Sequence, residues 1–163
     1  LLVLYPLINL SKVLTNLWGL ETDMNDYQKT AVYKWEDQYI VPKISKKIDF
    51  DKCQIIVDYI WSKLGYINPP KVHIDKSLKT RSLGGRYNIR LAEHMVNEHV
   101  LIHELAHSVN LIEPDDSFDI HGPKFVADYA SLLIKFYNFD MLYLVHTLKL
   151  NKIDVDMGRL LNK

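Results

Sequence analysis

Hydrophobic and polar positions along the chain predict helices on both sides of a short stretch of strands. Large apolar side chains follow Asn25-Asp26 at helical spacing as far as Pro42, and a second such run extends from Asp51 to Gly65. Asn and Asp are favoured helix caps, whereas Pro and Gly commonly end helices. We therefore expect one helix between each pair of signals, with the tryptophan of each helix in the core (Trp35 and Trp61).

Two short segments in the middle of the chain alternate as strands do. Val72-His73-Ile74 follows a Pro-Pro turn, and residues 87–91 follow Leu83-Gly84-Gly85-Arg86, which has the composition of a turn or bulge. The second strand comes just before the most apolar helix, so it would border a cleft there. Tyr87 and Ile89 are then candidates to hold an extended substrate by strand addition, and a plain structural hairpin is the alternative.

The second half of the chain predicts three more helices. Residues 100–109 are mostly apolar, a second run follows Pro123, and a third follows Asp140, a favoured cap. Between the first two, residues 113–120 form a loop, with Pro114 as helix stop and Asp115-Asp116-Ser117 as turn. Helices combined with a few short strands predict a compact α+β domain, in which helices pack on a small, mainly antiparallel sheet.

Composition favours a globular protein of one domain and gives little support to a nucleic-acid-binding or lipid-binding protein. The chain has 163 residues, of which 48% are hydrophobic and 25% charged, and this suits one globular domain with a real core. Its formal net charge is zero, so the molecule as a whole does not attract nucleic acid or acidic lipid. A basic run near the strands is typical of a solvated face, and it supports nucleic-acid binding only weakly because no aromatic stacking motif accompanies it (Lys71, Lys76, Lys79, Arg81, Arg86 and Arg90).

The first 23 residues differ from the rest. Asn9, Ser11 and Lys12 interrupt their apolar beginning, which makes it too broken for a membrane span, and no basic leader or small-residue cleavage site marks a signal peptide. Met24 is a candidate for a later start of translation. We therefore interpret residues 1–23 as an N-terminal appendage, with a truncated signal sequence as the alternative, and residues 24–163 as a single domain.

The residues with the clearest chemistry are His103-Glu104-Leu105-Ala106-His107. On an α-helix the two histidines lie one turn apart on the same face, so both imidazoles can bind one metal ion. Glu104 is turned by about 100° around the axis, where it can reach a water molecule on the metal instead of acting as a ligand in line. This H-E-x-x-H pattern indicates two zinc ligands and a general base. The alternative, two ordinary surface histidines, is disfavoured by the apolar flanks of the helix.

A catalytic zinc ion usually has three protein ligands and an open position for water. The pattern with a third histidine six residues after the second does not apply, because Glu113 occupies that position. His121 is the preferred third ligand, since the loop before it lets the chain fold back and Gly122-Pro123 then begins a helix. Asp128 on the same helix is the competing ligand, because a carboxylate also binds zinc.

Other polar residues near the motif have weaker roles. His99 lies one turn before His103 but about 12 Å along the helix from His107, so it is expected behind a ligand, in the cleft wall or on the surface. Tyr87 and Tyr129 are candidates to stabilise an oxyanion, and Asp119 is a candidate to orient a ligand histidine. The single cysteine, Cys53, excludes both an internal disulfide and a cysteine zinc cluster and fits a reducing compartment.

The H-E-x-x-H motif together with His121-Gly122-Pro123-Lys124-Phe125 resembles the SprT/Spartan type of zinc metallopeptidase, in which the third histidine begins an H-G-P-x-F segment. A closer resemblance is to small metallopeptidases of actinobacteria and their phages, whose Q-R/K-x-x-V-Y-x-x-E segment is matched by residues 28–36. The likeness spans residues 26–137. It implies a zincin-like fold with the motif on a central helix. SprT-type proteins often add a cysteine-rich zinc ribbon, which this chain lacks, so a DNA-coupled role is not implied.

These observations predict a zinc-dependent metallopeptidase in the cytoplasm of a bacterium or a phage-infected cell. Zn²⁺ would be held by His103, His107 and His121, and Glu104 would activate the water that attacks a peptide bond of a protein or peptide substrate. The alternatives are a non-catalytic, zinc-stabilised structural or adaptor protein, for example of a phage, and a zinc hydrolase of non-peptide amides. A purely structural site needs no base, so Glu104 argues against the first alternative.

Overall fold

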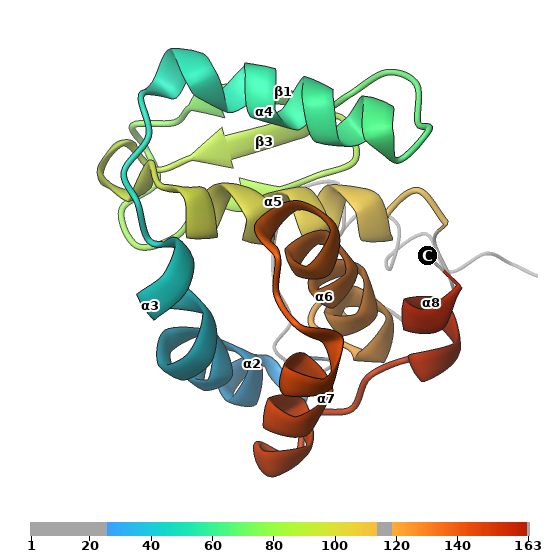
Figure 1. Cartoon of the computed structure of the whole chain (residues 1–163). Coiled ribbons are helices and arrows are strands. Elements are labelled where there is room, and N and C mark those ends of the chain that lie inside the picture. Colours follow the sequence, from blue (N-terminus) through green and yellow to red (C-terminus); the bar gives the residue numbers. More distant parts are fainter. Residues whose placement is uncertain (1–25, 114–118, 163) are drawn as a thin grey trace, which may run out of the picture.

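The computed structural model describes residues 26–113 and 119–162, in which helices pack around a small three-stranded sheet (Figure 1). This mixed architecture confirms the α+β class. The proposed appendage at residues 1–23 lies outside the described residues, as do the helix stop and turn predicted within residues 114–118. In the two described ranges, no helix has both the length and the apolar character needed to cross a bilayer.

The first helical segment changes its geometry along its length. It consists of α2 (Lys29–Trp35), the π-helical turn η2 (Glu36–Ile40) and α3 (Val41–Ile44). The prediction that Pro42 ends this segment is wrong by about one turn, because Pro42 occupies the first turn of α3, where its missing N–H group is tolerated. The predicted cap, Asp26, does not cap α2 with its side chain; its carboxylate binds His121 instead.

Helix α4 (Phe50–Lys63) begins slightly earlier than predicted. Asp49 is its N-cap residue, and Asp51 lies in its first turn, where a negative charge favours the helix dipole. Gly65 follows the helix with a φ of 78°, a left-handed conformation that glycine adopts without strain, so this end agrees with the predicted stop.

The sheet has the strand order β1-β3-β2, formed by β1 (Lys71–Ile74), β2 (Leu83–Gly84) and β3 (Asn88–Leu91). β1 and β3 are parallel, whereas β2 pairs antiparallel with β3. The prediction of a mainly antiparallel sheet is therefore wrong. The tight turn makes β2 and β3 antiparallel, whereas the longer connection between β1 and β2 lets β3 return parallel to β1.

The remaining helices are α5 (Glu98–Asn110), α6 (Pro123–Tyr137), α7 (Met141–Leu150) and the short α8 (Met157–Leu161), with the 3₁₀ turn η3 (Glu93–Met95) before α5. Asn97 caps α5 by accepting from the Val100 N–H group at 2.9 Å. Asp140 caps α7 by accepting from the Tyr143 N–H group at 2.7 Å, as predicted. α8 was not expected, because the sequence after residue 150 shows no readable pattern.

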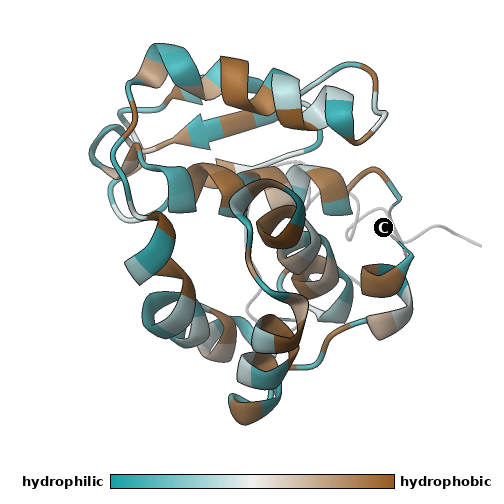
Figure 2. Cartoon of the chain, in the orientation of Figure 1, coloured by the Kyte–Doolittle hydropathy of each residue, from teal (hydrophilic) through white to brown (hydrophobic). Residues whose placement is uncertain are grey.

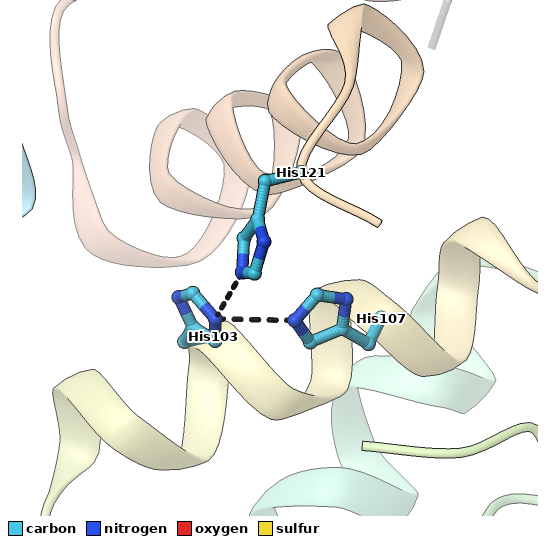
Figure 3. A group of neighbouring side chains, drawn as sticks. All are labelled: His103, His107 and His121. Atoms are coloured by element: carbon cyan, nitrogen blue, oxygen red, sulfur yellow. Dashed lines mark hydrogen bonds between the residues drawn. The ribbon is translucent and has the colours of Figure 1, made fainter. Parts of the chain in front are cut away.

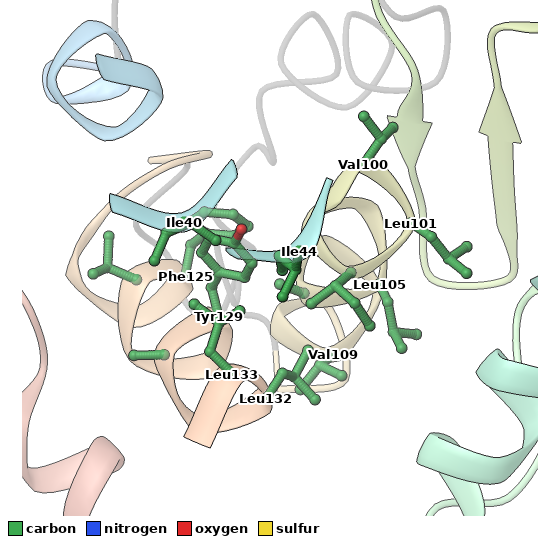
Figure 4. Packing of buried hydrophobic residues seen from close by; sticks show 14 of the residues in the cluster. Ile40, Ile44, Val100, Leu101, Leu105, Val109, Phe125, Tyr129, Leu132 and Leu133 are labelled. Carbon is green, nitrogen blue, oxygen red and sulfur yellow. The ribbon is translucent and has the colours of Figure 1, made fainter. Parts of the chain in front are cut away.

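The core lies where α5 and α6 pack against each other, with the sheet and α4 on one side and α2 and α3 on the other (Figure 1). Both central helices carry hydrophobic residues along much of their length (Figure 2). Ile40 and Ile44 close the space between them (Figure 4). Trp35 and Trp61 are both fully buried, which confirms their predicted place in the core. The most apolar helix, α5, is therefore held rigidly from several sides.

Candidate metal centre

Three imidazole rings meet where α5 faces the beginning of α6. His103 and His107 lie one turn apart on α5, and His121 immediately precedes the Gly122-Pro123 pair that begins α6. The Nε2 atoms of His107 and His121 lie 3.1 and 3.4 Å from Nε2 of His103 (Figure 3). The structure thus brings together the three histidines that the sequence singled out.

The spacing of these nitrogen atoms fits a tetrahedral metal site. Zinc–nitrogen bonds of about 2.05 Å at tetrahedral angles place two ligand nitrogens about 3.3 Å apart, and the observed distances of 3.1 and 3.4 Å lie on either side of that value. All three ligand atoms lie within 4.8 Å of one another. The three rings are close enough to bind one metal ion, and imidazole suits zinc, copper, iron and nickel.

Two carboxylates hold the outer nitrogens of these rings. The Nδ1 atom of His103 lies 2.7 Å from Oε1 of Glu36, and Nδ1 of His121 lies 2.7 Å from Oδ2 of Asp26. The other Asp26 oxygen accepts from the His121 N–H group at 3.1 Å. Carboxylates in this position place the proton on Nδ1 and leave Nε2 unprotonated for a metal ion. Asp26 and Glu36 are therefore the residues that orient the ligands.

The charges of the site also favour a cation. The Glu36 and Asp26 side chains are only 2% and 9% exposed, and buried carboxylates are costly unless positive charge lies nearby. Burial opposes the charged forms of His103 and Glu36, but their mutual attraction outweighs it, so the pKa of His103 is raised to about 9 and that of Glu36 is lowered to about 2. A divalent ion bound at the Nε2 atoms would supply this positive charge in place of the His103 proton.

His107 differs from the other two ligands in its electrostatics. Burial, followed by electrostatic repulsion from the neighbouring His103 and His121 rings, lowers the pKa of His107 well below its ordinary value. The ring is therefore neutral at ordinary pH, which is the form that binds a metal ion.

Glu104 lies beside His103 on α5 and against strand β2. It is 7% exposed, and burial raises its pKa, while His103 and the Gly84 N–H group that donates to its carboxylate partly offset this rise. The approach of the two elements is very close, because a Cβ atom added at Gly84 would lie 2.1 Å from the main-chain oxygen of Glu104. A carboxylate with a raised pKa is suited to accept and return a proton near neutral pH.

Aromatic rings enclose the ligands on two sides. Phe125, fully buried, lies with its ring centre 5.3 Å from that of His103, 4.3 Å from that of His107 and 5.0 Å from that of His121. Tyr33 on α2 contacts the rings of His103 and His121, and it is 40% exposed. The site therefore has an apolar floor formed by Phe125 and a partly exposed phenol, Tyr33, beside His103 and His121.

Gln28 links the third ligand to the C-terminal part of the chain. Its amide nitrogen donates to the carbonyl oxygens of His121 at 2.8 Å and Asp154 at 3.1 Å, and its amide oxygen accepts from the Asp154 N–H group at 2.9 Å. Gln28 is 3% exposed. The segment at residues 26–36 thus contacts the site through Asp26, Gln28, Tyr33 and Glu36.

Several other candidates lie elsewhere. Asp128, the competing third ligand, receives hydrogen bonds from Arg159 at 2.7 and 3.0 Å and stands outside the histidine cluster. Asp119 lies against Gly122, but the carboxylate that orients the His121 ring is that of Asp26. His99 lies behind a ligand, with Nε2 3.4 Å from the same Glu36 oxygen that holds His103.

The two tyrosines considered for the oxyanion are both displaced from the expected position. Tyr129 is fully buried, with its ring 5.7 Å from that of His103, and burial together with the nearby Glu36 raises its pKa well above the ordinary value. Tyr87 is 67% exposed and lies against the Arg86 guanidinium. Ile89 is fully buried in β3, the central strand, so the edge strand beside Glu104 is β2.

The sequence did not single out Asp26 and Glu36 as site residues. Asp26 is explained locally as a helix cap, and Glu36 as a charged residue on the surface of a helix. The signal that could have pointed to Glu36 was the Q-x-x-x-V-Y-x-x-E segment, which begins at Gln28 and ends at Glu36, whereas Asp26 lies two residues before that segment. No family of proteins, curated protein or solved structure matches the chain in comparisons with each of these groups.

Proposed function

We propose that the protein is a zinc-dependent metallopeptidase of zincin-like fold, in which His103, His107 and His121 hold zinc and Glu104 is the general base. The observation that carries the proposal is the convergence of three imidazole rings, with Nε2 of His107 and of His121 at 3.1 and 3.4 Å from Nε2 of His103, and with the Glu104 carboxylate on the next residue of the same helix. A structural zinc site would normally have four protein ligands. The histidine cluster of the described residues has three members, which leaves a position for water.

When bound, zinc lowers the pKa of a water molecule to about 7 and polarises a carbonyl group. Glu104 accepts a proton from the water as it attacks the carbonyl carbon, and then gives that proton to the leaving nitrogen. Burial assists this exchange, because it raises the pKa of Glu104 toward the working range. Glu36 and Asp26 keep the rings of His103 and His121 in the orientation that the reaction requires.

A peptide substrate is favoured by the position of β2. This strand lies at the edge of the sheet, and its Gly84 N–H group donates directly to the Glu104 carboxylate. An extended peptide that added to the edge of the sheet would run past the catalytic carboxylate, with its backbone recognised rather than its sequence. A groove of about 520 Å³ is lined by Leu83, Gly84 and Gly85 with residues of β1 and β3, and it reaches the site only through Gly84, because neither Glu104 nor a ligand histidine lines it.

The resemblance to SprT/Spartan-type peptidases and to the small metallopeptidases of actinobacteria and phages gains support from the upstream segment. Gln28 and Glu36, its first and last residues, both bind ligand histidines. A segment that is shared between proteins and also holds the ligands is expected if the likeness reflects a common metal site. We therefore include the resemblance in the proposal.

Replacing Glu104 by Gln tests the function directly. The zinc-loaded wild-type protein should cleave casein, an unfolded general substrate, and Glu104→Gln should keep its zinc and fold while cleavage falls by at least about a hundredfold. Glu98→Gln, in the first turn of the same helix, is the matched control and should retain wild-type activity. A zinc-loaded wild-type protein that cleaves neither casein nor itself, as judged by mass spectrometry, would exclude the general peptidase and leave a structural zinc site or a non-peptide hydrolase.

A further inference from the structure

Tyr33 is a partly exposed aromatic residue that contacts two of the three ligand rings. Its ring centre lies 5.6 Å from that of His103 and 5.0 Å from that of His121, with the His121 ring meeting it edge-on. Phe125 contacts the same two rings but is fully buried, whereas Tyr33 is 40% exposed. The ligands therefore lie between the buried Phe125 ring and a phenol that is partly open to solvent.

The position of this phenol is fixed by its helix. Tyr33 and Glu36 are three residues apart, so they project from the same face of the helical segment. The Glu36 carboxylate binds His103 at 2.7 Å, and the indole of the intervening Trp35 donates to the Thr147 hydroxyl at 2.9 Å from a fully buried position. These two contacts tie α2 to the ligands and to α7. Tyr33 consequently has a set place relative to the metal centre rather than a mobile surface position.

We propose that Tyr33 is a catalytic residue of this centre, whose hydroxyl donates a hydrogen bond to the oxyanion that forms on the substrate carbonyl. The inference rests on the proposed peptidase function and assigns the group that completes it. As the water oxygen attacks the carbonyl carbon, the π electron pair moves to the carbonyl oxygen and the water proton goes to Glu104. The proton then passes to the nitrogen as the C–N bond breaks. Tyr33 keeps its own proton throughout and acts through the hydrogen bond.

The other tyrosines near the site lack this position. Tyr129 is fully buried behind His103, where Glu36 is its polar neighbour. Tyr87 is well exposed but packs on Arg86, and no contact of its ring with a ligand histidine occurs among the described residues. Of these three tyrosines, Tyr33 is the one that is both exposed and in contact with two ligand rings.

The substitution Tyr33→Phe tests the assignment, because it removes the hydroxyl and keeps the ring. In casein cleavage by the zinc-loaded protein, kcat should fall by about 10²–10³-fold, with little change in KM and in zinc content. A second readout needs no substrate: in the cobalt-substituted protein, acetohydroxamate binding is followed by the visible spectrum of the metal. Its dissociation constant should rise by about tenfold in Tyr33→Phe, because one hydrogen bond to the bound oxygen is lost. Tyr59→Phe, which removes the hydroxyl of an exposed ring on α4, is the control and should match the wild type in both assays.

The outcomes separate this inference from the function on which it rests. A Tyr33→Phe protein that binds acetohydroxamate within twofold of the wild type, or that turns over casein at an unchanged rate, overturns the role of Tyr33. Loss of zinc from Tyr33→Phe also overturns it, since the hydroxyl would then support the metal site itself rather than act on the substrate. A wild-type protein that binds acetohydroxamate but cleaves nothing contradicts the peptidase, whatever the substitution does.

Discussion

At the scale of single residues, Glu36 sets how strongly a proton competes with a metal ion for His103. Burial opposes the charged ring, yet the Glu36 carboxylate raises the pKa of His103 to about 9. A metal ion binds only the neutral imidazole, so binding releases that proton at any pH below the raised value. We predict that the apparent zinc affinity increases by about tenfold per pH unit from pH 6.5 up to about 9 and then levels off. Competition with a chelator of known pH dependence measures this.

Glu36→Gln should change how steeply the apparent zinc affinity rises with pH, and it should also lower that affinity at high pH. Without the negative charge, burial dominates and the His103 pKa falls, so the rise in affinity above about pH 6.5 should flatten. At pH 9 the variant should bind zinc about 10–100-fold more weakly, because its acceptor holds the ring less firmly. Asp37→Asn, at the next and exposed position, is the control and should reproduce the wild-type curve. An unchanged slope in Glu36→Gln would show that another group governs the proton of His103.

At the scale of elements, the contact of β2 with α5 is the closest approach in the site. A Cβ atom at Gly84 would lie 2.1 Å from the Glu104 main-chain oxygen, so Gly84→Ala must push strand and helix apart. We predict that it lowers the free energy of unfolding of the zinc-free protein by about 3 kcal/mol, as measured by urea denaturation. Gly158→Ala is the matched control, because its nearest neighbour would lie at 3.4 Å, an ordinary contact. Equal stability of the two variants would contradict this packing.

The elements also show how far the sequence determines the site. α5 and α6 could be predicted because apolar spacing, the Pro123 start and the histidine pattern all agree. The strand order could not, since β2 has two residues and no readable alternation, and β3 finds its partners through contacts distant in sequence. For the same reason Asp26 reads locally as a cap, although its partner His121 lies 95 residues away.

At the scale of the whole molecule, the two ends of the described chain meet around the third ligand. Gln28 binds both His121 and Asp154, and the Asp156 N–H group donates to the Pro123 carbonyl oxygen at 3.0 Å. The hydroxyl of Tyr27 donates to the Asp154 carboxylate at 2.9 Å. The described residues after 150 carry no predicted site residue, yet Asp154 and Asp156 help to fix the segment that presents His121.

Arg159 is the C-terminal side chain that joins most of these parts. It donates to Asp128 on α6 at 2.7 and 3.0 Å and to Glu113 beyond α5 at 2.8 Å. The side chains of Arg159 and Asp128 are 12% and 0% exposed, so removing the positive charge leaves a buried carboxylate poorly compensated. We predict that Arg159→Gln lowers the free energy of unfolding by about 3–5 kcal/mol, as measured by urea denaturation of the zinc-free protein.

The exposed pair of Lys52 with Asp49 provides the control for Arg159→Gln. Its side chains are 64% and 73% exposed, so Lys52→Gln should leave the stability without measurable change. Because Arg159 links the two sides of the loop that leads to His121, Arg159→Gln should also release zinc faster than Lys52→Gln when a chelator is added in excess. If the two variants unfold at the same urea concentration and release zinc at the same rate, Arg159 stabilises neither the fold nor the metal centre, and the position of His121 depends on other contacts such as those of Gln28 and Asp26.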